Sequence, residues 1–272
     1  MLCFPEGSVA SGEIRGGAPA TREFDLLAPE RTVDRIDAVL LTGGSAFGLA
    51  AADGVVEHLA DSGVGWDTEF GPVPIVVAMA LYDLAGGDGS VRPGPEEGRT
   101  AIQACGKDSD GEIPVGRVGA GAGATVGKWR GLDRARPGGL GLEVTEREGI
   151  VVAALFAVNS TGDPDDGAAA TAVLNGEFDS WPDTGILRLG RRDNTTLGVL
   201  VTNAQLSKAD CLLVAQSGHD GIARALFPAH TRFDGDAVVA VSTGTADGGP
   251  DAVDTVRVLA TVAAEQAIRK AC

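Results

Sequence analysis

The sequence predicts a fold of the α+β class, in which layers of helices pack on layers of β-sheet. Apolar runs of strand length mix with amphipathic helical stretches, without the repeated strand–helix–strand rhythm of a doubly wound parallel sheet. The chain has 272 residues, 44% of them hydrophobic, which is enough for a sizeable core. No internal repeat is evident, and we expect residues 1–272 to form a single domain.

Glycine turns separate the expected elements in the first half of the chain. Residues 1–30 are turn-rich and are expected to be loop with short strands. A buried strand is predicted at 37–41, followed by a glycine turn and a helix over 45–60 with Ser45 as its N-cap. The apolar stretch 73–82 is expected to be a strand or an irregular buried segment.

The second half contains clearer patterns. After a short helix at 96–105, strands are expected at residues 140–147, 150–158, 195–203 and 237–241, the first two as a hairpin. Ser207 and Asp210 have capping-box spacing before a helix that passes Arg224. A final helix is predicted over 251–270. Residues 160–194 are polar and rich in Asp, Gly, Pro and Thr, which predicts a long surface loop.

Composition excludes several classes of function. The formal net charge is -16, and such a surface repels phosphate backbones, so we expect no nucleic-acid partner. The four Cys residues form no CxxC pair and no cluster has metal-ligand spacing, so neither a metal nor another cofactor is expected. No signal-like start and no apolar run of about 18 residues is visible. We therefore expect a cytoplasmic protein with no membrane partner.

Two glycine-rich stretches suggest familiar motifs and fit none of them well. The turn at Ser45 is not a nucleophile elbow, because Phe47 stands where that motif needs Gly. The stretch 119–128 departs from a phosphate-binding P-loop at Ala122 and Trp129. We interpret it as a turn or strand that another backbone passes closely. Lys128, at its end, is either a lone surface cation or, near a site, an anion-holding group.

A sharp change of character occurs at Asn194 and Thr195. The charged run Arg191-Arg192-Asp193 ends there, and a strand rich in β-branched residues begins. The plain interpretation is a strand start, and the N-x-T glycosylation pattern has little support without a signal peptide. The alternative is a nucleophile, Thr195, that cleavage of the Asn194–Thr195 bond exposes as a new N-terminus. Local sequence alone leaves both open.

Several ordered motifs along nearly the whole chain make a resemblance specific. They are Arg15-Gly16-Gly17-Ala18-Pro19, the stretch 41–49, Tyr82-Asp83-Leu84, the stretch 119–128, Ala157-Val158-Asn159, Asn194-Thr195-Thr196-Leu197-Gly198-Val199, His219-Asp220-Gly221 and Asp234-Gly235-Asp236. The chain resembles the DmpA-type aminopeptidases, which include L-aminopeptidase/D-esterases, β-peptidyl aminopeptidases and nylon-oligomer hydrolases. Thr at the nucleophile position, with the Asp-Gly-Asp pair, leans toward the nylon-oligomer hydrolase branch.

The resemblance implies a four-layer αββα sandwich that cleaves itself into fragments 1–194 and 195–272. It implies Thr195 as the nucleophile, Asn159 as an oxyanion donor and Lys128 as a neighbouring site residue. Asp234 and Asp236 match an acidic pair that orients the nucleophile's amine and hydroxyl, and Tyr82 matches a substrate-pocket tyrosine. Relatives form tetramers of cleaved units, so a homo-oligomer is expected.

Elementary chemistry explains why such a chain would cut itself. A Thr hydroxyl is a weak nucleophile and needs a base. After cleavage the α-amine of Thr195 can be that base, since an α-amino pKa is about 8. Before cleavage the same nitrogen is an amide, so cleavage switches the enzyme on.

The expected function is hydrolysis of amide bonds through an acyl-Thr intermediate. Expected substrates are short peptides, amino-acid amides or esters, or aminohexanoate-type oligomers. An acyltransferase of the ornithine-acetyltransferase type and an inactive, unprocessed family member are the alternatives. Relatives begin some tens of residues earlier, with a strand ahead of residues 3–7, so either the start is misassigned or an edge strand is missing here. A missing strand would impair folding and self-cleavage.

Overall fold

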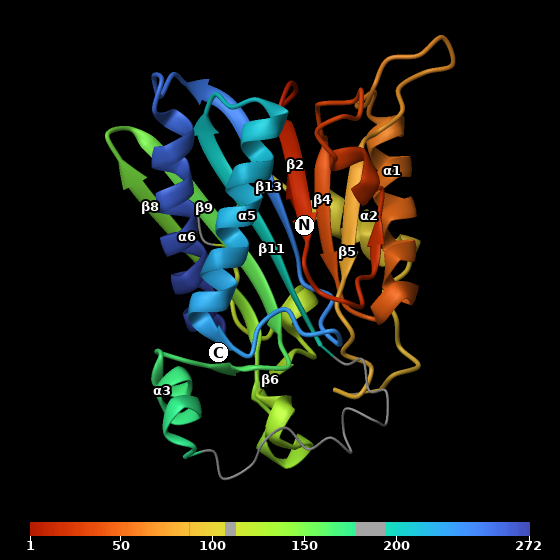
Figure 1. The fold of residues 1–272 in the computed structure, drawn as a ribbon. Helices are drawn as coiled ribbons and strands as arrows, with labels where there is room; N and C mark the ends of the chain where they lie inside the picture. The colour runs from red at the N-terminus through yellow and green to blue at the C-terminus, as the bar shows by residue number, and fades with distance from the viewer. Residues whose placement is uncertain (87, 107–112, 178–193) are drawn as a thin grey trace.

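The computed structural model contains four layers in the order helix, sheet, sheet, helix (Figure 1). It describes residues 1–86, 88–106, 113–177 and 194–272. Helices α5 (Lys208–Ala225) and α6 (Ala252–Ala271) cover one sheet on its outer face. Helices α1 (Ala51–Asp61) and α2 (Pro95–Ala104) cover the other. The expected αββα sandwich is confirmed.

One sheet has five strands in the order β2-β13-β11-β9-β8. These are β2 (Val9–Ile14), β13 (Ala237–Ala246), β11 (Thr195–Ala204), β9 (Ile150–Asn159) and β8 (Gly139–Arg147). The central strand β11 runs parallel to β13 and antiparallel to β9, and β8 and β9 form the expected hairpin. The strands expected in the second half of the chain are all confirmed, and β2 supplies a full edge strand from the turn-rich start.

The other sheet has four strands in the order β1-β4-β5-β3. They are β1 (Leu2–Cys3), β4 (Ala38–Thr42), β5 (Val76–Ala80) and β3 (Thr21–Arg22), and β4 and β5 are parallel. The apolar stretch 73–82 therefore contains a strand.

The expected start of the first helix is wrong. A 3₁₀ segment, η2 (Ser45–Ala50), precedes α1, and its N-cap is Gly44. Ser45 has a φ of 56°, in the left-handed region, and its side chain makes no capping bond. The reason lies in the neighbouring loop. Asp83 Oδ1 accepts the Gly44 N–H at 2.8 Å and Leu81 O accepts the Ser45 N–H at 2.9 Å, so groups outside the turn satisfy its first donors.

Three apolar clusters fill the spaces between the four layers. Alternating side chains along each strand point to opposite faces. Phe156 and Leu200 therefore pack against α5 and α6, whereas Leu197 and Val199 pack between the two sheets. The third cluster joins β4 and β5 to α1 and α2. Because odd-numbered residues of β11 face the space between the sheets, Thr195 faces it too.

Short elements cluster near the end of β9. They are η3 (Gly119–Gly121), β6 (Thr125–Val126), η4 (Lys128–Arg130), η5 (Leu132–Arg134) and β7 (Arg136–Pro137). A further short element, η1 (Phe24–Leu27), contacts β2. The glycine-rich stretch 119–128 is a close backbone approach, as expected. A Cβ on Gly121 would lie 2.5 Å from Leu140 N.

The expectation of an unbroken loop over 160–194 is wrong in its first part. The strand β10 (Asp163–Pro164) pairs with β12 (Leu226–Phe227), and α3 (Ala168–Asn175) follows. Asp165 Oδ1 accepts the Ala169 N–H at 3.0 Å, and the alanine-rich run after it favours helix. The later part of that expected loop, 178–193, with Arg191, Arg192 and Asp193, lies outside the described residues.

No helix in the described ranges combines the length and the apolar character needed to cross a membrane.

Candidate active site

Thr195 stands at the beginning of the central strand of the five-stranded sheet. It is 3% exposed and lies in register with Asn159, the last residue of β9. Its side chain lines a cavity of about 270 Å³ between the two sheets. The other lining residues are Ala18, Pro19, Ala20, Ser45, Ala46, Ala80 and Tyr82. The structure thus brings the expected nucleophile and the expected pocket tyrosine into one cavity.

The bond between Asn194 and Thr195 is buried and lies beside its expected attacker. The Thr195 hydroxyl donates a hydrogen bond to the carbonyl oxygen of Asn194, which is the carbonyl of that bond. The backbone N–H of Gly235 donates to the same oxygen at 3.1 Å. Both residues flanking the bond are buried. The hydroxyl therefore already contacts the peptide group that self-cleavage would break.

Asn159, the register partner of Thr195, is hydrogen-bonded to Lys128. Asn159 Nδ2 donates to Tyr82 O at 2.8 Å, and its Oδ1 accepts from Thr125 N at 2.9 Å. Lys128 Nζ donates to the same Oδ1 at 3.0 Å. Lys128 is only 6% exposed, so it is no surface cation. A buried ammonium hydrogen-bonded to Asn159, the register partner of Thr195, can stabilise negative charge that develops beside it.

The acidic pair Asp234 and Asp236 is buried, and Gly235 between them lies beside the Thr195 side chain. Asp234 accepts from Thr161 N at 3.0 Å and from Thr231 N at 2.9 Å. Burial and the charge of Asp236 together raise the pKa of Asp234 to about 6. Asp236 Oδ1 accepts the N–H of Thr196, the residue after the expected nucleophile, at 2.6 Å. Asp236 thus fixes the backbone of the strand that carries Thr195.

No site role was predicted for His219 or His230, a pair that adjoins Asp236. His230 Nδ1 lies 2.8 Å from Asp236 Oδ2, and the rings of His230 and His219 meet edge to face at 4.9 Å. Burial lowers the pKa of His230, but the hydrogen bond and charge of Asp236 outweigh it and the net shift is upward. Burial lowers the pKa of His219 to about 4, so that ring is neutral at physiological pH.

Little in the sequence could have identified His230, because it stands in an irregular loop with no periodic neighbours. Its neighbour Thr231 stands three residues before Asp234. A Thr hydroxyl often forms a hydrogen bond within its own turn. Thr231 Oγ1 does donate to Asp234 Oδ2.

The segment 15–19 braces the acidic loop. Arg15 N and Gly16 N donate to Asp236 O at 3.0 and 3.2 Å, and Ala18 N donates to Asp234 O at 2.9 Å. A Cβ on Gly16 would lie 2.3 Å from Asp234 O, so only glycine fits without a shift. This motif therefore positions the acidic pair as well as lining the cavity.

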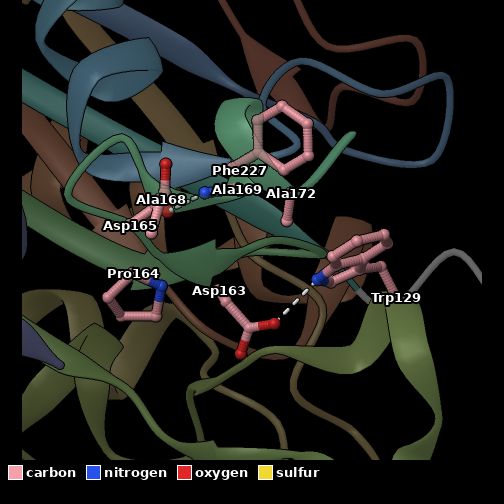
Figure 2. Close-up of a pocket in the computed structure, with 8 residues that line it drawn as sticks. All are labelled: Trp129, Asp163, Pro164, Asp165, Ala168, Ala169, Ala172 and Phe227. Atoms are coloured by element: carbon pink, nitrogen blue, oxygen red, sulfur yellow. Dashed lines mark hydrogen bonds between the residues drawn. The ribbon is translucent and has the colours of Figure 1, made fainter. Parts of the chain in front are cut away.

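A second pocket, of about 220 Å³, is lined by Trp129, the residue after Lys128 in the chain (Figure 2). Trp129, Phe227, Asp163 and the start of α3 form its walls. Figure 2 shows Asp163 pointing at the Trp129 indole, whose Nε1 donates to Oδ2 at 2.7 Å. Arg136 donates to the other carboxylate oxygen at 3.0 Å. These contacts fix η4, which carries Lys128, whereas Thr195 lines the other cavity.

Comparison with known sequences points to one family. Residues 2–272 match the model of peptidase family S58. An uncharacterized aminopeptidase of Mycobacterium tuberculosis is 41% identical over 264 residues, which cover 91% of this chain and 74% of that protein. The 6-aminohexanoate-oligomer endohydrolase of Paenarthrobacter ureafaciens is 28% identical over 265 residues, which cover 91% of this chain and 69% of that protein.

Solved structures share the fold. A beta-aminopeptidase of Burkholderia sp. superposes with a TM-score of 0.72 at 19% identity, covering 97% of this chain and 73% of that one. An L-aminopeptidase D-Ala-esterase/amidase from Ochrobactrum anthropi, described as a variant of the Ntn hydrolase fold, gives 0.70 at 19% identity. That match covers 97% of this chain and 72% of the other. The sandwich is therefore of the Ntn hydrolase type.

Proposed function

The chain belongs to peptidase family S58, and from that premise we propose that this hydrolase cuts its own Asn194–Thr195 bond and then uses Thr195 to hydrolyse amide bonds of small substrates. One observation carries the proposal. The buried Thr195 hydroxyl is hydrogen-bonded to the carbonyl oxygen of Asn194, at the head of a cavity that could admit a substrate. Fragments 1–194 and 195–272 would result.

Self-cleavage creates the catalytic base. Thr195 Oγ1 attacks the Asn194 carbonyl carbon, the C–N bond breaks, and water opens the resulting ester. A free α-amine has a pKa of about 8, so the new α-amine of Thr195 can take the proton of the Thr195 hydroxyl. The same hydroxyl attacks a substrate amide, the amine product leaves, and water hydrolyses the acyl-Thr195 ester.

The neighbouring side chains supply charge and position in the proposed turnover. Asn159 is the oxyanion donor and Lys128, hydrogen-bonded to it at 3.0 Å, adds positive charge beside it. Asp236 holds Thr196 and accepts from His230, which keeps the new N-terminus in place. Asp234 holds the same loop in place by accepting hydrogen bonds from the backbone N–H groups of Thr161 and Thr231.

The cavity favours short, largely uncharged substrate groups. The described residues that line it are small or apolar apart from the hydroxyls of Ser45, Tyr82 and Thr195. We infer that short peptides, amino-acid amides or esters, and aminohexanoate-type oligomers are the substrate class, in keeping with the names of the relatives. We infer a reducing, cytoplasmic setting, which the free thiols of all four cysteines support.

The first prediction concerns Thr195 itself. The purified chain should give two bands on a denaturing gel, with intact masses of residues 1–194 and 195–272. Thr195→Ala removes the hydroxyl and should leave one uncut, folded chain without hydrolase activity. Release of free amine from short peptide amides and from aminohexanoate oligomers measures turnover.

A matched control changes the next residue. Thr196 is also a buried β-branched residue, and Thr196→Val keeps its shape, so that chain should still be cut. An uncut wild-type chain that still hydrolyses amides would contradict the mechanism. Acyl transfer to an added amine at a rate above hydrolysis would favour the acyltransferase alternative.

A further inference from the structure

We propose that the backbone N–H of Gly235 is the oxyanion donor of the self-cleavage step, a role that rests on the proposed function and extends it. This N–H donates to the carbonyl oxygen of Asn194 at 3.1 Å. The Thr195 hydroxyl donates a hydrogen bond to the same oxygen. One carbonyl thus has its attacking hydroxyl and a backbone donor already in place, which is the arrangement that acyl transfer requires.

The step balances with the groups present. Thr195 Oγ1 forms a bond to the Asn194 carbonyl carbon, and the π electron pair of the carbonyl moves onto its oxygen. The Gly235 N–H stabilises that oxyanion. When the pair returns, the C–N bond breaks, and the departing nitrogen of Thr195 takes up the proton that Oγ1 gave. The product is an ester, which water hydrolyses to the Asn194 carboxylate and the free hydroxyl.

Both neighbours of Gly235 are locked, so its N–H needs no reorganisation. The Asp234 side chain accepts from Thr161 N and Thr231 N, and its carbonyl accepts from Ala18 N at 2.9 Å. The Asp236 side chain accepts from Thr196 N at 2.6 Å. A donor fixed before the reaction in a water-excluded site stabilises developing charge most effectively.

Glycine is the residue that this position accepts. A Cβ on residue 235 would lie 2.8 Å from Thr195 Oγ1 and 2.8 Å from Ala18 O. The flanking acids would repel an oxyanion if both were charged. Burial and the charge of Asp236 raise the pKa of Asp234, which shifts it toward its neutral form and lessens that repulsion.

An ordinary structural role for the same bond predicts a different outcome. Asn194 and Asp234 form an isolated parallel bridge in the register of the β11–β13 pairing, three residues before its first pair, Leu197 with Ala237. If the bond were only a rung of the sheet, its loss would cost stability, of the order of 1 kcal/mol, without a specific effect on the cleavage rate.

The test removes the N–H and leaves the shape. Glycolic acid placed at position 235 by suppressor tRNA in cell-free synthesis turns the Asp234–Gly235 amide into an ester. We expect the first-order rate of cleavage at Asn194–Thr195, followed by intact mass, to fall roughly 10²- to 10³-fold. Gly235→Ala would not serve, because its methyl group would displace the Thr195 hydroxyl. Breakage of the ester itself gives a different mass.

The control is the same ester at Gly63, whose N–H donates to Ala60 O at 3.0 Å in the turn after α1. That chain should be cut at the wild-type rate. Thermal unfolding of both esters on a Thr195→Ala background separates misfolding from chemistry. If the Gly235 ester folds and its cleavage slows by less than about tenfold, the proposal is overturned. If the wild-type chain is never cut, the proposed function itself fails.

Discussion

Two buried lysines show how the same residue type serves different ends in this molecule. Lys128 is 6% exposed, and its ammonium donates to Asn159 Oδ1 beside Thr195. Lys208 is 9% exposed, at the start of α5, and donates to three backbone carbonyls, those of Leu26, Arg31 and Val33. A charged donor that satisfies carbonyls stabilises a fold, whereas one beside a nucleophile stabilises charge during reaction.

Replacing each lysine by methionine separates these roles. Lys128→Met keeps most of the side-chain volume and removes the charge. We expect it to lower the rate of self-cleavage by about 10²-fold or more. The kcat/KM of the fraction of the variant that is cleaved should fall to the same extent. Lys208→Met should instead lower Tm, because three backbone carbonyls lose their charged donor, with kcat/KM within a few-fold of wild type.

Rates come from intact mass and amine release, and Tm from circular dichroism. A Lys128→Met chain that is cut and active at the wild-type rate would remove Lys128 from the machinery.

At the scale of elements, the segment 15–19 and the acidic loop 231–236 fit together through close backbone contact. Their hydrogen bonds run between backbone atoms, Ala18 N to Asp234 O and Arg15 N to Asp236 O. A Cβ on Gly16 would lie 2.3 Å from both Asp234 O and Asp236 N, so the absence of a side chain sets the spacing. The position of Gly235 above Asn194 depends on this contact.

Gly16→Ala tests that dependence. The added methyl group must push segment 15–19 away from the acidic loop 231–236. A displacement of about 1 Å at a reacting centre can lower the rate roughly 10²-fold. We expect self-cleavage to slow to that extent while the four layers still form. Gly94→Ala is the matched control, since its Cβ would meet only Glu97 Oε2 at 3.5 Å. Cleavage of the Gly16→Ala chain at the control rate would show that the brace is dispensable.

Pattern and propensity predicted the long elements well, because their information is local. The strands expected at 150–158, 195–203 and 237–241 and the capping box of Ser207 and Asp210 are confirmed, and each depends on residues within one element. Ser45 was mistaken for an N-cap because the donors of its turn are satisfied by Asp83 and Leu81, about 40 residues away. Such partners leave no local trace.

The site was predictable to the extent that the resemblance carried it. It named Thr195, Asn159, Lys128, Tyr82 and the acidic pair, and the structure brings all of them together. The hydrogen bonds of Gly235 and His230 were not predicted, because a backbone N–H has no sequence signal and His230 meets Asp236 only in the folded chain. Their partners are set by tertiary structure alone.

At the scale of the whole molecule, the proposed cleavage would divide the chain without dividing the fold. Fragment 195–272 would supply β11, β13, α5 and α6, and fragment 1–194 would supply β2, β8 and β9. The sheet order β2-β13-β11-β9-β8 then places strands of one fragment between strands of the other. The junctions β2–β13 and β11–β9 would both join the two fragments.

The last prediction follows from this interleaving. The cut chain should elute from a sizing column as one species and separate into fragments only in denaturant. Separation would break two strand junctions and expose the core in which Phe156 of β9 packs with Val256 and Ala263 of α6. For the same reason, residues 195–272 produced alone should not fold, since β11 and β13 would have open edges and an uncovered apolar face.

The uncut Thr195→Ala chain is the control, and its elution should match that of the cut chain. Release of the 195–272 fragment in native buffer would contradict the prediction. The interleaving also gives cleavage a physical meaning. Because neither fragment could leave, the new amine of Thr195 would stay in the pocket where its amide nitrogen stood, and under the proposed function one broken bond would convert a finished fold into the active enzyme.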